Sequence, residues 1–206
     1  MYDFGVRGGR YGGVRDMLFL TGDTRSRKII EKLKLNLVGR MVIAKVITPY
    51  LYEPWAFDNG AYSYFLRGLV FNAKEYQTRM EKVYNKMGAP LFSVVPDIVQ
   101  GGQKSLDFSL SWINKMPSEW VKYLAVQDGM TIEDITPIYS QFDGLFLGGS
   151  DKFKAEHGKA FTDYSHGLCK QVHYGRAGTP KKIYHAKIIN VDSCDSAFPL
   201  RHMNRF

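Results

Sequence analysis

Short apolar segments alternate with helix-compatible stretches along almost the whole chain, and this alternation restricts the fold more than any other feature. The apolar segments are Met17–Leu20, Met41–Ile47, Trp55–Phe57, Leu91–Val95, Tyr123–Val126, Gly144–Leu147, Gln171–Tyr174 and Ile188–Val191. The stretches between them that favour helix are Arg25–Leu35, Ala73–Met87, Ser105–Asn114, Ile132–Tyr139, Lys152–Cys169 and Lys181–Lys187. Alternating strands and helices predict parallel strands joined by crossover helices. Eight such units fit a compact, TIM-like (β/α)8 barrel of the α/β class better than an open sheet.

The length of the chain suits one domain. Its 206 residues are 45% apolar and 14% aromatic, which is enough for a hydrophobic core and excludes a disordered chain. We therefore expect residues 1–206 to form a single barrel domain. Within residues 1–16, three arginines are interleaved with five glycines, which predicts either a flexible arm that contacts phosphates or a mobile terminus.

The charge of the chain points to a polyanionic partner, because a net charge of +8 produces a field that attracts phosphate backbones. The two cysteines are too few for a disulfide framework, so a reducing cytoplasm is expected. No apolar run approaches the ~20 residues that span a bilayer, so no membrane partner is expected. The histidines lack metal-ligand spacing, and the chain predicts neither a metal nor a cofactor; these histidines are His157, His166, His173, His185 and His202.

Polar residues follow several of the predicted strands, at the end of the barrel where enzymes of this fold carry their sites. They are Asp58, with the turn Asn59-Gly60 and Tyr62, then Asp97, Gln127, Gly148, Gly149, Asp192 and Asp195. Taken singly, an aspartate or a glycine pair at such a place is explained equally well as a turn former. Their joint occurrence favours a binding site.

As a set, these residues match a purine of the guanine type. Carboxylates accept from its ring N–H and its exocyclic amine, an amide or a glycine N–H donates to its carbonyl, and an aromatic ring stacks on its face.

The chain resembles the tRNA-guanine transglycosylase superfamily in its closing motif. Gly178-Thr179-Pro180 is followed, after twelve residues, by Asp-x-x-Asp-x-x-x-Pro-x-Arg, which begins at Asp192 and ends at Arg201. In that family the second aspartate of the motif is the nucleophile, which implies this role for Asp195 and a supporting role for Asp192. The turn at Asp58 is similar to the family segment that supplies the general acid/base and a stacking aromatic, which implies these roles for Asp58 and Tyr62.

The resemblance extends over about residues 55 to 201 and implies base-binding roles for four further positions. Asp97 matches a second base-reading aspartate and Gln127 a glutamine, while Gly148 and Gly149 match glycines that bind the carbonyl side of the base. The chain departs from the family at Asn59 and Ala61, and at Asp128, where a glycine follows the family's glutamine.

Family members that act on tRNA carry a cysteine-rich zinc subdomain after the motif, and this sequence has no matching cysteine pattern. The chain thus looks most like the compact, zinc-free 7-deazaguanine DNA transglycosylases, including the small ones that bacteriophages encode. The resemblance implies replacement of guanine in DNA by a 7-deazaguanine through a covalent glycosyl-aspartate, with DNA and a free 7-deazaguanine base as partners. Five basic residues are candidate contacts to the nucleic-acid backbone: Arg176, Lys181, Lys182, Arg201 and Arg205.

Three alternatives remain at this stage. A zinc-free tRNA-guanine transglycosylase would have the same pocket. A barrel enzyme for a small phosphorylated ligand would use Gly148-Gly149 and Gly178-Thr179 as phosphate-binding turns. A non-catalytic nucleic-acid-binding module would use only the positive field of the protein.

Overall fold

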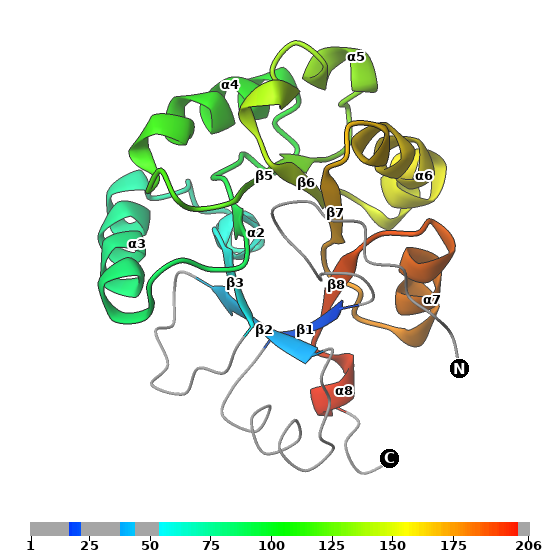
Figure 1. Ribbon diagram of the computed structural model, residues 1–206, viewed down its shortest axis with the longest axis horizontal. Coiled ribbons are helices and arrows are strands. Elements are labelled where there is room, and N and C mark those ends of the chain that lie inside the picture. The colour runs from blue at the N-terminus through cyan, green and yellow to red at the C-terminus, as the bar shows by residue number, and fades with distance from the viewer. Residues whose placement is uncertain (1–16, 22–37, 44–53, 202–206) are drawn as a thin grey trace.

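The computed structural model describes residues 17–21, 38–43 and 54–201. Their strands form a closed barrel in which each strand is parallel to the next in sequence and the last pairs with the first (Figure 1). The strands are β1 (Met17–Thr21), β2 (Val38–Ile43), β3 (Trp55–Asp58), β4 (Ser93–Val94), β5 (Lys122–Val126), β6 (Gly144–Leu147), β7 (Gln171–Tyr174) and β8 (Ser193–Ser196). The predicted (β/α)8 architecture is confirmed.

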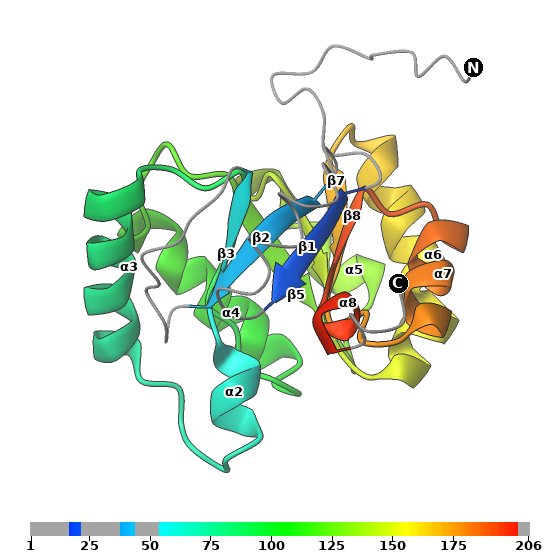
Figure 2. The ribbon, with the colours of Figure 1, turned by 90° about the horizontal axis from the view of Figure 1, so that it is seen from below.

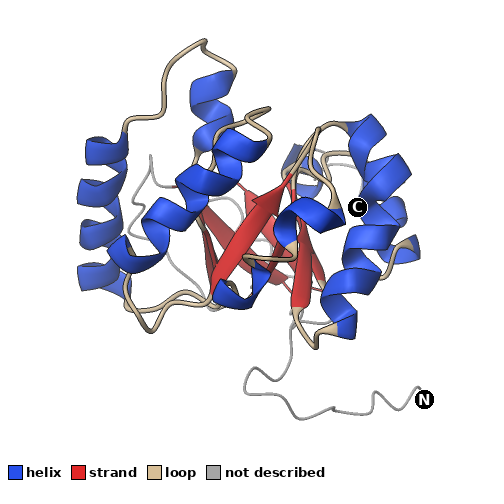
Figure 3. Ribbon diagram, turned by 90° about the horizontal axis from the view of Figure 1, so that it is seen from above, coloured by secondary structure: helices blue, strands red, loops and turns tan. Residues whose placement is uncertain are grey.

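Helices surround the ring of strands on its outer side (Figure 3). The described helices are α2 (Ala61–Phe65), α3 (Ala73–Met87), α4 (Gln103–Trp112), α5 (Ile132–Ile135), α6 (Asp151–Gly167), α7 (Pro180–Ile188) and α8 (Phe198–Arg201). None of them is both long and apolar enough to cross a membrane. The predicted helix Arg25–Leu35 and the arginine-glycine segment lie outside the described residues.

Three of the helices differ by more than two residues from the sequence-based expectation, and one of them, the short α8, was not predicted. Helix α5 ends at Ile135 instead of Tyr139, because Pro137 has no amide hydrogen with which to continue the helix. Helix α2 was not predicted either, and it projects past the end of β3 (Figure 2). This end of the barrel, to which the carboxyl ends of the strands point, is called the mouth below.

The predicted last strand is wrong in position. Helix α7 continues to Ile188, the Ile189 amide donates to the His185 carbonyl at 3.0 Å, and β8 begins only at Ser193. The side chain of Ile189 is buried because it packs between the helices and the barrel. The apolar residues taken for a strand therefore belong to the end of a helix and the turn after it.

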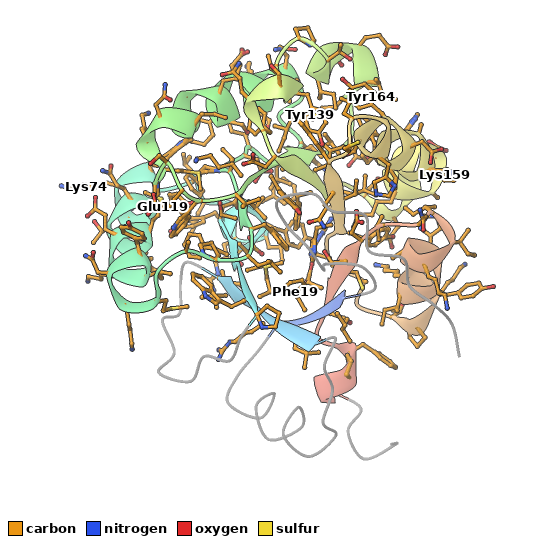
Figure 4. All side chains as sticks on the ribbon, in the orientation of Figure 1. Phe19, Lys74, Glu119, Tyr139, Lys159 and Tyr164 are labelled. Carbon is orange, nitrogen blue, oxygen red and sulfur yellow. The ribbon has the colours of Figure 1, made fainter. Side chains whose placement is uncertain are left out.

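The core has two layers, as expected when alternate residues of a strand face opposite sides. The outer layer, between strands and helices, includes Trp55, Phe57 and Leu145. The inner layer fills the barrel and includes Phe19 and Phe92, both fully buried, whose rings meet edge to face at a centroid distance of 5.4 Å. Phe19 lies within the ring of strands, whereas Lys74 and Lys159 lie on its periphery (Figure 4).

Candidate active site

Asp195 lies on β8 with its side chain inside the barrel. One carboxylate oxygen, Oδ1, accepts hydrogen bonds from the Arg176 amide at 2.8 Å and from His173 Nε2 at 3.2 Å. The other oxygen, Oδ2, accepts no hydrogen bond from the described part of the chain. The carboxylate is thus fixed through one oxygen while the other stays available for chemistry.

His173 connects Asp195 to the interior of the barrel, and it was not among the site residues expected from the sequence. It is fully buried, its Nδ1 lies 2.8 Å from Ser193 Oγ, and its ring stacks on Phe146 at 5.3 Å. Burial lowers the pKa of His173, although the Asp195 carboxylate opposes this effect. Because a carboxylate oxygen can only accept, the neutral ring carries its proton on Nε2 and directs it to Asp195. The signal in the sequence was a polar residue at an inward-facing position of β7.

Asp58 is the last residue of β3 and faces the mouth from another strand of the barrel. Its Oδ1 accepts the Gly60 amide at 2.8 Å, which shapes a turn in which Gly60 has a φ of 77°. Burial, together with the negative charges of Asp195 and Asp97, raises the pKa of Asp58 to about 7, although the hydrogen bond from the Gly60 amide and the charge of Arg176 oppose the rise. A carboxyl with this pKa can both give and take a proton at neutral pH.

Asp97 is the second carboxylate beside the mouth, and Asn59 positions it. Asn59 Nδ2 donates to Asp97 Oδ1 and to the Val95 carbonyl, both at 2.8 Å, so the turn after β3 is tied to the loop after β4. Burial raises the pKa of Asp97 to about 6, while the hydrogen bonds from Asn59 and Gln127 oppose the rise. Asn59, which the sequence presented as a turn residue, is therefore part of the site.

Gln127 lies at the predicted strand end but its amide is engaged within the protein. Nε2 donates to the Ile98 carbonyl at 2.8 Å, and Oε1 accepts the Gln100 amide at 2.7 Å. Only 2% of the residue is exposed. In this arrangement Gln127 shapes the loop after β4 and offers no free donor to a ligand.

The loop after β6 contains Gly148 and Gly149. The Gly148 amide donates to the Val126 carbonyl at 2.9 Å, so it too is engaged within the protein. Gly149 has a φ of 74°, and a Cβ atom there would lie 2.8 Å from Asp128 Oδ2, so the loop requires glycine. Ser150 donates from its amide and from its hydroxyl to Asp128, which ties this loop to the one after β5. Among the described residues, the amide of Gly149 has no acceptor.

Arg176 lies inside the mouth, whereas the sequence suggested that it contacts the nucleic-acid backbone at the rim of the mouth. Its guanidinium carbon lies 3.9 Å from the centre of the Tyr62 ring, and Nη2 donates to the Gly149 carbonyl. Tyr62, on α2, is itself exposed, at 37%. Arg176 therefore bridges α2, the loop after β6 and the loop after β7.

Lys154, on the first turn of α6, contacts the backbone just before Arg176, and it was not among the site residues expected from the sequence. Its ammonium group donates to the Gly175 carbonyl and lies 4.5 Å from the centre of the Tyr174 ring. Burial lowers the pKa of Lys154 to about 7, and the positive charge of Arg176 contributes to this. A single lysine within an amphipathic helix gives no sequence signal that it turns toward the barrel.

Asp192 does not lie at the mouth, contrary to the expectation from the misplaced strand. It precedes β8, and its Oδ2 lies 2.9 Å from His166 Nε2 and accepts the Val172 amide at 2.7 Å. Val172 is near the start of β7 and His166 is near the end of α6, so Asp192 joins elements at the opposite end of the barrel. Its place indicates a structural role.

The remaining basic candidates are placed as follows. Lys181 is exposed on the first turn of α7, and Lys182 forms an ion pair with Asp151 at 2.9 Å. Arg201 is the last residue of α8, and Arg205 lies outside the described residues.

The mouth thus combines three carboxyl groups, one aromatic face and the carbonyl of Gly149, which accepts from Arg176. These groups are acceptors, so the site suits a planar ligand edge that carries N–H donors. Two of the carboxyls have raised pKa values, and the third has an oxygen without a described donor. Such a set can perform acid/base and nucleophilic chemistry.

No protein-family model matches the chain, and no curated protein matches it. Among solved structures, one described as the "Putative Copper Homeostasis Protein CutC" from Streptococcus agalactiae is similar, with a TM-score of 0.43 and 13% sequence identity. The alignment covers 88% of each chain.

Proposed function

We propose that the protein replaces guanine in DNA with a 7-deazaguanine base through a covalent glycosyl-aspartate intermediate. The observation that carries this proposal is the geometry of Asp195, with Oδ1 held by two donors and Oδ2 without a donor from the described residues. The same mouth contains Asp58, whose pKa of about 7 suits proton transfer at neutral pH.

In the first step, Asp195 Oδ2 forms a bond to C1′ of the deoxyribose as the bond from C1′ to N9 of guanine breaks. The electron pair of that bond leaves with guanine, and protonated Asp58 supplies the proton that neutralises it. In the second step, Asp58 takes the proton from the ring nitrogen of the incoming base as that nitrogen attacks C1′ and releases Asp195. Two inversions give net retention at C1′.

Base recognition rests on acceptors and on stacking. To Asp97, which Asn59 holds in place, we assign the role of acceptor for the ring N–H and exocyclic amine of a guanine-type base. Tyr62 provides the stacking face. A base cannot reach this site from within a duplex, so the nucleotide must be extruded or single-stranded.

The test is an exchange assay with labelled 7-deazaguanine and either DNA or tRNA, followed by mass spectrometry of the released nucleosides. We expect label in DNA with release of an equal amount of guanine. Label in tRNA with inert DNA would favour the zinc-free tRNA enzyme instead. Absence of exchange on both, with retained binding of nucleic acid, would favour a binding module.

A further inference from the structure

The Arg176 side chain covers the ring of Tyr62, the residue on which the proposed function stacks the base. Its guanidinium group covers the Tyr62 ring at 3.9 Å and donates to the Gly149 carbonyl. The charge of Arg176 also acts on both Asp58 and Asp97. The guanidinium therefore contacts the aromatic face and the carbonyl, and its charge acts on two carboxyl groups of the site.

The backbone holds Arg176 in this place. Its φ of 60° lies in the left-handed region, which is unfavourable for a residue with a side chain. The conformation is kept because the Arg176 amide donates to Asp195 and the preceding carbonyl, of Gly175, accepts from Lys154. The same backbone bonds that orient Asp195 thus fix the point from which the Arg176 side chain enters the mouth.

A guanidinium group shares its chemistry with one edge of guanine. Both are planar, and both present N–H donors on nitrogens bonded to a common carbon. A site with an aromatic face and acceptors around it satisfies either group.

We infer that Arg176 is an internal surrogate for the base: its guanidinium occupies the base position in the ligand-free protein, and the base must displace it to bind. This inference rests on the proposed function for the identity of the base. Displacement frees the guanidinium for a phosphate of the substrate, which links base entry to binding of the nucleic acid.

The displacement also has an electrostatic consequence that suits the reaction. Arg176 opposes the rise in the pKa of Asp58, so its departure removes a positive charge and raises that pKa further. Asp58 then holds its proton at neutral pH, which is the form that the departing guanine requires.

The experiment compares Arg176→Ala and Arg176→Gly with the unmodified protein in calorimetric titrations with 7-deazaguanine. Glycine tolerates the left-handed backbone, so it covers the case in which alanine destabilises the fold. We expect both variants to bind the base roughly tenfold more tightly, since no cation–π contact has to be broken first. Weaker or unchanged binding in both variants would overturn the inference. Lys152→Ala, at an exposed position of α6, is the matched control for the loss of one positive charge.

A second measurement does not depend on the identity of the substrate. Guanidinium chloride at millimolar concentration is titrated into both Arg176 variants, with equal sodium chloride as the reference and NMR shifts of the tyrosine rings as the readout. We expect saturable binding to the variants and none to the unmodified protein. No saturable binding would show that the surrogate inference is wrong. Saturable guanidinium binding without any base exchange would instead count against the proposed function alone.

Discussion

At the scale of single residues, the two oxygens of Asp195 have different surroundings, and this difference is central to the proposed chemistry. Oδ1 accepts from an amide and an imidazole, while Oδ2 accepts from no donor in the described part of the chain. Asp58 and Asp97 lie in the same low-dielectric region, where burial disfavours their charged forms. Three carboxyl groups in one mouth can therefore take different roles.

Asp195→Asn is expected to lower exchange at least about a thousandfold, because the amide keeps an acceptor for Arg176 but cannot form the glycosyl ester. The measurement is label incorporation together with denaturing gels that detect a covalent adduct with DNA. Asp192→Asn is the matched control, since it changes the same chemical group at the far end of the barrel. An adduct that persists in Asp195→Asn but vanishes in Asp192→Asn would reassign the nucleophile.

Asp58→Asn is expected to stabilise the fold at alkaline pH relative to acid pH. A carboxyl whose pKa rises from 3.8 to about 7 on folding binds its proton more tightly in the folded state. Its contribution to stability is complete below about pH 4 and is lost as the pH rises through about 7. Above about pH 7 the unmodified protein therefore buries the negative charge of Asp58, whereas the asparagine of the variant stays neutral. The gain is at most a few kcal/mol, since one pKa unit corresponds to about 1.4 kcal/mol.

Urea unfolding at about pH 4 and about pH 8 measures this difference. Asp107→Asn, at an exposed position of α4, is the control. If the unfolding free energies of Asp58→Asn and the unmodified protein differed by the same amount at both pH values, folding would not raise the pKa of Asp58.

At the scale of elements, neighbouring strands supply the support for each reactive group. His173 on β7 and Asp195 on β8 both face the interior and meet there, and the β7 to α7 loop adds the Arg176 amide. The Asn59 turn after β3 likewise holds Asp97 after β4. The reactive geometry depends on strand pairing as much as on the reactive residues.

His173→Phe is expected to keep the barrel folded and to lower kcat by about 10- to 100-fold, the value of one hydrogen bond to a charged group. Phenylalanine fits among the surrounding rings of Phe19, Phe92 and Phe146 but cannot donate to Asp195. Steady-state kinetics should show a fall in kcat with little change in KM. A similar fall in His173→Gln and His173→Phe would argue that packing, not the hydrogen bond, is what matters.

At the scale of the whole molecule, the net charge is +8, and some of the basic residues lie close to the mouth. Helix α7, which carries Lys181, begins just after the loop that contains Arg176. Lys181 is exposed on the first turn of α7, at the mouth end of that helix, whereas Lys86 is exposed on the last turn of α3, at the opposite end of the barrel. DNA that enters the mouth should pass the first lysine and not the second.

Lys181→Glu is therefore expected to weaken DNA binding and to reduce the slope of log affinity against log salt by about one, as for the loss of one phosphate contact. Lys86→Glu changes the net charge equally and should leave the slope nearly unchanged. Fluorescence anisotropy at several salt concentrations distinguishes the two. Equal effects of both substitutions would mean that DNA is attracted by the overall field without a defined path past α7.

The sequence by itself determined the barrel and the strand-end positions of Asp58, Asp97 and Gly148, because periodic apolar segments report which residues are buried. Only the tertiary structure decided what buries them. Ile189 is apolar because it packs between α7 and the barrel. Strand β8 (Ser193–Ser196) is buried despite its polar sequence, because it pairs with β1 and β7 and carries Asp195 of the candidate site. Contacts between segments far apart in the chain likewise engage the Gln127 amide, place Arg176 on Tyr62 and move Asp192 to the opposite end. Such contacts leave no local pattern in the sequence.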